Sequence, residues 1–405
     1  MKNIDFAALA SEFGTPLYIY DFDKVKERYN ALKSQFGAHK SLICYAVKAN
    51  SNLSLLKLLA SLGSGFDCVS LNEVKRAILA GASPYKIIYS GVGKSDDEIR
   101  TALEIGILML NIESGAELER VENIAKSLNK KANISIRINP DIDAKTHPYI
   151  STGLNENKFG VILSRAKELY LKAHNSEFLE PVGCHFHIGS QLLDIAPIHE
   201  AANIVSDFVS ELKAANIELK FFDVGGGLGV RYKDETEPDL YAYAQGILAA
   251  LKGKEMTIIC EPGRYIIANA GVLLAKVLYE KNNGAKRFVI TDAAMNDLIR
   301  PSLYSAYHEI SLIGGENNEL CDTPCDIVGP ICESGDFLAR NLEFPACKSG
   351  DLLLIKSAGA YGFSMASNYN SRTKAAEIAL EDGKTRLIRA RESFEDLIRN
   401  EKGLL

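Results

Sequence analysis

The sequence predicts an α/β protein in which a closed (β/α)8, TIM-like barrel is joined to a C-terminal antiparallel β-barrel or sandwich domain. Eight apolar strand candidates alternate with helical patterns between residues 40 and 263, and short β-branched runs follow Gly271. Strict strand–helix alternation implies parallel strands, and eight such units imply a closed barrel.

The strand candidates end at residues that expose backbone or carry polar side chains. In chain order they end near Lys48, Ser70, Gly91, Ser114, Asn139, Gly189, Gly227 and Gly263. The helical pattern after the first strand places leucines at i, i+3, i+4 and i+7, and Gly63 stops it. These leucines are Leu55, Leu58, Leu59 and Leu62.

Three strand-to-helix junctions have the Ser-x-x-Glu spacing of a capping box. They are Ser70 with Glu73, Ser95 with Glu98, and Ser114 with Glu117. Each serine can accept a hydrogen bond from an orphan helix N–H while the glutamate reaches back.

The sequence pattern after Gly271 predicts a β domain. Residues 272–279 are apolar and β-branched, Asn282-Asn283-Gly284 is a turn signal, and short runs continue to residue 355. The early strand 17–20 is expected to pair with this domain. We therefore expect a cofactor-binding barrel over 24–268, and a Greek-key-like β domain over 1–23 plus 269–405 that completes the active site.

The composition argues against a nucleic-acid-binding, membrane-spanning or secreted protein. The formal net charge is −6 without a basic block, so nucleic acid is not an expected partner. No apolar stretch reaches the length of a membrane span, and the first residues lack the apolar core of a signal peptide. The scattered cysteines favour reduced thiols in a cytoplasm, because the Cys321/Cys325 pair lacks a second zinc-finger pair.

Reactive side chains gather where barrel enzymes carry their chemistry, at the C-terminal ends of the strands. These ends read Lys48, Asp67, Glu113, Arg137, His187, Gly225-Gly226-Gly227 and Glu261. A polar residue that merely begins a loop explains Glu113 well. It explains the apolar-embedded Lys48, His187 and Glu261 poorly.

Lys48 follows the apolar run 42–47. An unpaired ammonium there is costly to desolvate, and a desolvated lysine can form a Schiff base. Taken alone, Lys48 is better explained as a lysine that snorkels from a strand end, and only the other residues of the chain favour the Schiff base.

The surrounding residues match the needs of pyridoxal 5'-phosphate, namely a lysine, an anion site, a partner for the ring nitrogen and a flat contact. The triplet Gly225-Gly226-Gly227 lets backbone N–H groups approach a phosphate, although such triplets are also tight turns. Ser190 offers a hydroxyl and Arg264 a cation for the same phosphate.

Glu261 is the candidate for the pyridine nitrogen. A carboxylate there keeps the ring protonated and a strong electron sink, as decarboxylases need, whereas a barrel racemase would pair the nitrogen with arginine. His187 is the candidate to stack on the ring. His185 and His187 can also be read as metal ligands, but the sequence places no carboxylate nearby.

Six ordered motifs resemble the fold-type III pyridoxal phosphate decarboxylases, from about Thr15 to Tyr369. They are Tyr45–Asn50, Phe66–Ser70, His185–Gln191, Gly225–Gly227, Cys260–Tyr265 and Gly329–Asp336. The resemblance implies Lys48 as the Schiff-base lysine, His187 on the ring and Glu261 at the nitrogen. It places Ser190, Gly227, Gly263, Arg264 and Tyr361 around the phosphate, and implies that Asp67 and Arg137 steady the lysine and the cofactor.

Within the family, residues 329–336 are similar to the branch that decarboxylates meso-diaminopimelate to L-lysine and CO2, the last step of lysine biosynthesis. Ornithine-type members carry aspartate where Glu333 stands. The resemblance implies Cys332 as the proton donor and Glu333 as the partner of the substrate's distal ammonium. It implies that Arg300 and Tyr304 bind the distal carboxylate, with Arg264 and Tyr361 also contacting substrate.

Each of these residues has a simpler reading. Arg300 would then be in a salt bridge with a surface carboxylate, Cys332 would be a small buried hydrophobe, and Tyr361 an ordinary packed tyrosine.

The family forms homodimers, so Cys332 and Glu333 are expected to reach the partner's site. Two rivals remain: a polyamine-pathway decarboxylase of the same fold, acting for example on carboxynorspermidine, and a non-catalytic carrier of the cofactor. Whether the segment around His147-Pro148-Tyr149 closes as a lid is left open.

Overall fold

The structure, a computed structural model, describes residues 4–143, 158–284, 286–315 and 318–405. The segment around His147-Pro148-Tyr149 lies outside these residues. The chain divides into two compact units, a barrel unit (Lys26–Val230 and Thr236–Ile266) and a β unit (Met1–Val25, Arg231–Glu235 and Ile267–Leu405). Within the described ranges, every helix is too short or too polar to cross a bilayer.

Eight parallel strands form a closed ring in the barrel unit, which confirms the predicted (β/α)8 barrel. The ring closes because β5 pairs with β6, and the two-residue β7 (Val161–Ile162) adds to β6. In ring order the strands are β2 (Ser41–Ala46), β3 (Gly65–Cys68), β4 (Ile87–Tyr89), β5 (Met109–Ile112), β6 (Ala132–Asn139), β8 (Leu179–His185), β9 (Phe221–Asp223) and β10 (Thr257–Cys260).

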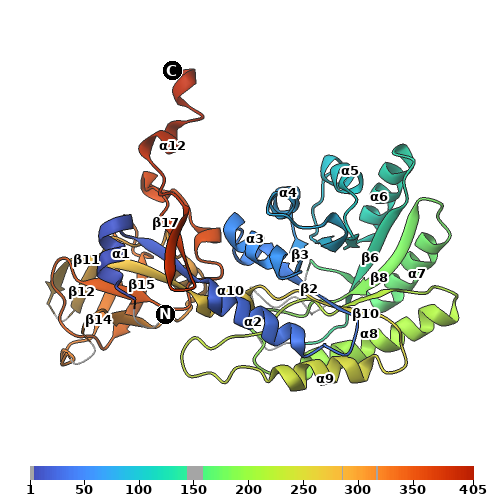
Figure 1. Ribbon diagram of the computed structural model, residues 1–405, viewed down its shortest axis with the longest axis horizontal. Helices are drawn as coiled ribbons and strands as arrows, with labels where there is room; N and C mark the ends of the chain where they lie inside the picture. The colour runs from blue at the N-terminus through green and yellow to red at the C-terminus, as the bar shows by residue number, and fades with distance from the viewer. Residues whose placement is uncertain (1–3, 144–157, 285, 316–317) are drawn as a thin grey trace. The chain divides into compact units, whose positions relative to one another are not determined.

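Helices lie on the outside of this ring (Figure 1). Successive strands are connected by α3 (Leu53–Ser61), α4 (Leu71–Leu79), α5 (Asp96–Ile105), α6 (Gly115–Ser127), α7 (Leu163–His174), α8 (Ala196–Ala214) and α9 (Leu240–Ala250). The helix α2 (Phe22–Ser34) precedes the first barrel strand, and α10 (Arg264–Ile267) follows the last. The helix α3 buries Leu55, Leu56 and Leu59 and ends just before Gly63, as the leucine spacing predicts.

The predicted capping boxes occur in two forms. Ser95 and Glu98 form the complete reciprocal box at α5. At α4, Ser70 caps the helix as predicted, but the Glu73 carboxylate accepts from the Val69 N–H, one residue earlier. The glutamate thereby ties the strand end, and not the cap residue, to the helix.

Seven of the eight barrel strands end earlier than the sequence pattern suggests, whereas β6 ends at Asn139 as predicted. The first ends at Ala46, and Lys48 lies in the 3-10 turn η1 (Val47–Ala49) that follows. Apolar residues continue past the last ladder hydrogen bond because the turns at the barrel mouth are themselves buried, so hydrophobicity alone overextends these seven strands.

The β unit contains one mixed sheet. Its main path is β15-β14-β12-β11-β1-β17-β18, and β16 pairs with both β11 and β13. The strands are β1 (Leu17–Asp21), β11 (Gly271–Asn283), β12 (Lys286–Thr291), β13 (Ile310–Leu312), β14 (Cys325–Val328), β15 (Phe337–Leu342), β16 (Leu352–Ile355), β17 (Ala376–Glu381) and β18 (Lys384–Arg389). The helices are α1 (Phe6–Phe13), α11 (Arg300–Tyr304) and α12 (Phe394–Ile398).

The early strand joins this sheet, as predicted. β1 runs antiparallel to β11, with Leu17 opposite Leu274, and parallel to β17. A second parallel pair, β12 with β14, makes the sheet mixed and not purely antiparallel. One apolar cluster packs β1, β11 and β17 together beneath Leu9 of α1.

Two glycines allow a close backbone approach where β11 begins. A Cβ on Gly359 would lie 2.0 Å from the Ile267 carbonyl oxygen, and a Cβ on Gly271 would lie 2.3 Å from Gly359 Cα. The Gly359 N–H also donates to the Ala268 carbonyl at 3.1 Å. No side chain fits at this crossing without moving backbone.

We expect Gly359→Ala to destabilise the protein by about 1–3 kcal/mol, because the added methyl group must displace main chain. Thermal unfolding followed by circular dichroism measures the effect. Gly93→Ala is the matched control, because a Cβ there meets nothing within 4 Å. Equal unfolding temperatures for the two variants would show that the crossing is not tight.

Candidate active site

Lys48 and Asp67 face each other across the first two barrel strands. The ladder pairs Ala46 with Asp67, which brings the turn η1 beside the end of β3. Lys48 Nζ donates to Asp67 Oδ2 at 3.1 Å; the lysine side chain is 40% exposed and the aspartate fully buried. An ion pair therefore holds Lys48 at the barrel mouth. The sequence suggested a desolvated lysine, but the side chain is still partly in contact with water.

Opposing influences act on the pKa of the Asp67 carboxyl group. Burial raises its pKa, the nearby Glu261 raises it further, and the Lys48 ammonium opposes both. Its Oδ1 atom is buried and accepts no hydrogen bond from the described residues.

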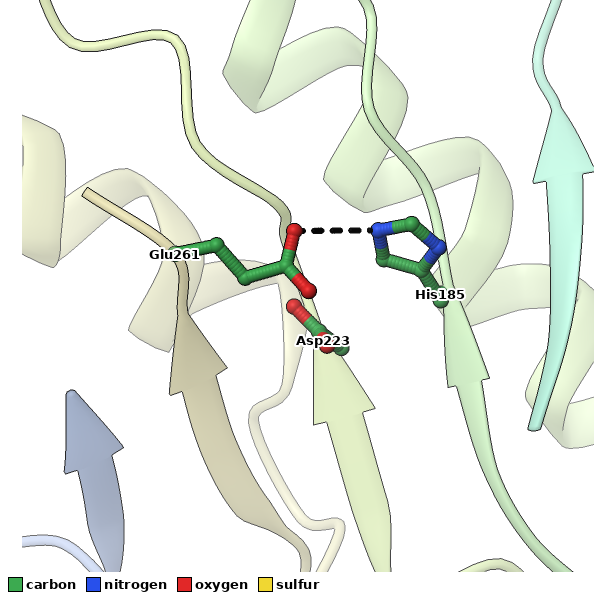
Figure 2. Close-up of side chains that lie close together, drawn as sticks. All are labelled: His185, Asp223 and Glu261. Carbon is green, nitrogen blue, oxygen red and sulfur yellow. Dashed lines mark hydrogen bonds and ion pairs between the residues drawn. The ribbon is translucent and has the colours of Figure 1, made fainter. Parts of the chain in front are cut away.

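Three buried ionisable residues meet at the ends of β8, β9 and β10. Figure 2 shows His185, Asp223 and Glu261 directed toward one another from these neighbouring strands. His185 Nε2 lies 3.3 Å from Glu261 Oε2, and one ligand atom from each residue lies within 4.8 Å of the others. The expectation that no carboxylate lies near His185 is therefore wrong, because strand pairing brings in groups distant in sequence.

The two carboxyl groups of this cluster differ in electrostatics. Burial alone would raise the pKa of Glu261, but His185, helped by the Lys48 charge, outweighs it and lowers the pKa to about 2. Burial raises the pKa of Asp223 well above its usual range, and the Glu261 charge raises it further. Asp223 Oδ1 accepts from the Gly225 N–H at 2.9 Å.

The glycine triplet packs between the strand ends. Gly225 and Gly227 have φ values of +67° and +102°, in the left-handed region that favours glycine. A Cβ on Gly226 would lie 2.3 Å from the Glu261 carbonyl oxygen. Close packing against Glu261 therefore requires bare backbone here. The N–H groups of Gly225 and Gly226 already donate to Asp223 and His187, so Gly227 is the member of the triplet proposed for an anion.

His187 is fixed by this triplet. Its Nδ1 accepts from the Gly226 N–H at 3.2 Å, and its carbonyl accepts from Arg137 at 3.3 Å. Burial lowers the pKa of His187 well below its usual range, and the Arg137 and Lys48 charges lower it further. The ring is thus neutral, with the acceptor nitrogen directed at backbone.

The predicted anion-binding residues come together. Arg264, at the start of α10, donates to Ser190 Oγ at 3.0 Å. The loop that carries Ser190 pairs with the glycine loop, since the Leu192 N–H donates to the Gly227 carbonyl at 2.8 Å. Gly263 packs against the turn η1, where its Cβ would lie 3.0 Å from Ala49 Cβ.

Arg137 is held by Glu113, which does more than begin a loop. Arg137 donates to Glu113 Oε1 at 3.0 Å, and the Gly160 N–H donates to Glu113 Oε2 at 2.8 Å. The Glu113 N–H donates in turn to Glu117 on α6. Both members of the Arg137–Glu113 pair are buried, so the guanidinium is held rigidly at the end of β6.

Five predicted residues lie in the β unit. Arg300 is buried at the start of α11, and Tyr304 ends that helix half-buried. Cys332 is exposed, so the reading of Cys332 as a small buried hydrophobe is wrong for the described chain. Glu333 is exposed and accepts from the Tyr369 hydroxyl at 2.9 Å. Tyr361 has a φ of +56°, in the left-handed region that is strained for a residue with a side chain.

Asp223 is the site residue that sequence reasoning missed. Asp223 ends the apolar strand β9 directly before the glycine triplet, and the sequence pattern alone assigns it no role. One feature of the sequence could have identified Asp223 as a site residue. An acidic residue at the end of an apolar strand is costly to bury, and the neighbouring strands also end in reactive residues.

The barrel site fits a pyridoxal cofactor. Glu261 Oε1 is buried and accepts no hydrogen bond from the described residues, although the carboxylate is ionised. A protonated ring nitrogen would supply the missing donor. Lys48 provides the amine and the Arg264–Ser190 pair provides anion contacts that the same group needs.

Comparison with known proteins gives the same answer. Residues 22–268 match the model of the family described as pyridoxal-dependent decarboxylase, pyridoxal binding domain. The diaminopimelate decarboxylase of Campylobacter jejuni is 63% identical over 403 residues, which cover 99% of this chain and 100% of the relative.

Solved structures agree. That of Helicobacter pylori diaminopimelate decarboxylase complexed with L-lysine has a TM-score of 0.96 and 57% identity, covering 99% of this chain and 100% of that chain. A structure of an SrLDC mutant in complex with PLP has a TM-score of 0.84 and 25% identity, covering 94% of this chain and 96% of that chain. The chain therefore belongs to the pyridoxal-dependent decarboxylases, within the diaminopimelate decarboxylase family.

Proposed function

We propose that this chain decarboxylates meso-diaminopimelate to L-lysine and CO2, with pyridoxal 5'-phosphate bound in the barrel. One observation carries the chemistry: a buried glutamate, Glu261, is kept ionised by His185 and retains an acceptor atom for a ring nitrogen. The substrate follows from the family and from the relatives that bear this name over their full length.

The residues of the barrel hold the cofactor. Lys48 would form the covalent bond to it, and Asp67 orients the lysine through their ion pair. Neutral His187 would contact the ring, while Ser190, Arg264, Gly227 and Gly263 would bind the phosphate. When bound, the cofactor supplies the electron sink for the electrons of the breaking bond between Cα and the carboxylate.

Residues of the β unit, together with Arg264 of the barrel unit, bind the substrate, and a residue of the β unit protonates it. Arg300 and Tyr304 hold the distal carboxylate, with Arg264 and Tyr361 contributing, and Glu333 holds the distal ammonium. Cys332 donates a proton to the Cα atom that has lost CO2, so that one proton replaces one carboxylate. Cys332 and Glu333 act in the site of a partner subunit, and the enzyme is a cytoplasmic homodimer.

We also infer that Asp223 retains a proton that faces Glu261. Two ionised carboxylates in one buried site repel each other, and His185 is paired with Glu261. Asp223 Oδ1 accepts from backbone, whereas Oδ2 is buried without a partner among the described residues. A proton on Oδ2 leaves a single negative charge on Glu261. Glu261 Oε1 has two lone pairs, so it can accept from Asp223 and still accept from a ring nitrogen.

The direct test of the function is CO2 release from meso-diaminopimelate, measured beside ornithine, arginine and carboxynorspermidine. We expect release from diaminopimelate alone, with L-lysine as the product. Release from carboxynorspermidine instead would keep the cofactor site and overturn the substrate. Bound cofactor without release from any substrate would favour a carrier.

Asp223→Asn should raise the unfolding temperature at pH 7 by about 2–4 °C. The folded pKa of Asp223 is raised, so the folded protein keeps a proton that the unfolded chain loses above about pH 4. Asp223 therefore lowers the free energy of unfolding as the pH rises above that value. Asparagine does not titrate, so it removes this loss while its amide group can still donate a hydrogen bond.

Scanning calorimetry at several pH values tests this, and the difference between variant and wild type should shrink toward pH 4. Asp207→Asn, on the exposed face of α8, is the control. A lower unfolding temperature for Asp223→Asn at pH 7 would mean that the native carboxyl is ionised.

A shared site predicts complementation between subunits. Lys48→Ala and Cys332→Ala are each expected to be nearly inactive, and mixing them under conditions of subunit exchange should restore up to about a quarter of wild-type activity in a symmetric dimer. Activity assays with sedimentation measure this. A monomer with the full wild-type rate, or exchange without recovery, would contradict the proposed dimer.

A further inference from the structure

Arg300 is held by a histidine, His308, four residues after α11. Arg300 Nη1 lies 2.8 Å from His308 Nε2, and both side chains are buried. His308 Nδ1 lies 2.8 Å from the Lys356 carbonyl oxygen. Since these contacts lie within the β unit, they are independent of where that unit sits.

The partners define the tautomer of His308. A guanidinium only donates hydrogen bonds and a carbonyl only accepts them. His308 must therefore accept at Nε2 and carry its hydrogen on Nδ1, which is the neutral form of the ring. In a doubly protonated ring, the Nε2–H group of His308 would point at the N–H group of Arg300, and the two donors would repel each other.

An aromatic face restrains the same guanidinium. Arg300 Cζ lies 4.7 Å from the centre of the Tyr232 ring, and that ring meets the His308 ring edge-on at 5.7 Å and 83°. The Tyr232 N–H is fixed by the Glu235 carboxylate at 2.9 Å. The imidazole thus sets one end of the guanidinium and the phenol ring sets its plane.

We propose that His308 is a positioning residue that orients Arg300 for the distal carboxylate of the substrate. The inference rests on the proposed function, in which Arg300 binds that group. A neutral acceptor fixes the guanidinium without cancelling its charge, whereas a carboxylate at the same place would compete with the substrate. This explains why the buried partner is a neutral ring.

Two substitutions of His308 separate positioning from packing. His308→Gln can place an amide oxygen near the position of Nε2 and keep the acceptor for Arg300. His308→Asn is similar in polarity but reaches only to the position of Nδ1, and keeps the bond to Lys356. Only variants with wild-type cofactor absorbance and unfolding temperature are compared.

We expect His308→Asn to raise KM for meso-diaminopimelate about tenfold to a hundredfold, as for loss of a hydrogen bond to a charged group, with kcat changed less than about threefold. His308→Gln should stay within about threefold of the wild type in both constants. The inhibition constant of L-lysine, which carries the same carboxylate, should rise in parallel in His308→Asn.

Equal KM values for the two variants, or a fall in kcat at unchanged KM, would overturn the positioning role. Arg300→Lys distinguishes this failure from failure of the proposed function. If Arg300→Lys leaves KM for diaminopimelate unchanged, Arg300 does not bind the distal carboxylate. If the wild type does not release CO2 from diaminopimelate, the substrate assignment itself is wrong.

Discussion

The site depends on one buried negative charge. Glu261 lies at the end of a barrel strand in a place where burial alone would keep it neutral, and His185 on the adjacent strand end reverses that preference. Glu261 carries the negative charge of this three-residue cluster, because burial and the Glu261 charge both favour the protonated form of Asp223. An ionised carboxylate with an unused acceptor atom is what a protonated pyridine ring requires.

The closed barrel is what makes this arrangement possible. Parallel strands all end at one rim, so residues far apart in sequence become neighbours there, and the pairing of β8, β9 and β10 sets the three groups side by side (Figure 2). The loops at the same rim have a second role. Gly226 is bare because the Glu261 backbone lies against it, and its N–H holds His187, so the packing that fixes the carboxylate also orients the ring contact.

The sequence predicts the barrel well because its strand–helix alternation is strict and its reactive residues fall at strand ends. It predicts the position of Lys48 less well, because buried turns extend the apolar run beyond the strand. The cluster around Asp223 and the His308–Arg300 contact could not be predicted, since both arise from pairing between elements. The parallel pairs of the β unit were missed for the same reason, because alternation within a strand does not identify its neighbour.

The charge state of Glu261 is the claim on which the chemistry rests, and infrared difference spectroscopy measures it directly. The spectrum of the wild type minus that of Glu261→Gln isolates the bands of this side chain across a pH series. The account predicts carboxylate bands at neutral pH that persist until the pH approaches about 2, the lowered pKa of this residue. A carboxylic-acid carbonyl band at neutral pH would show that Glu261 is protonated and would contradict its role at the ring nitrogen.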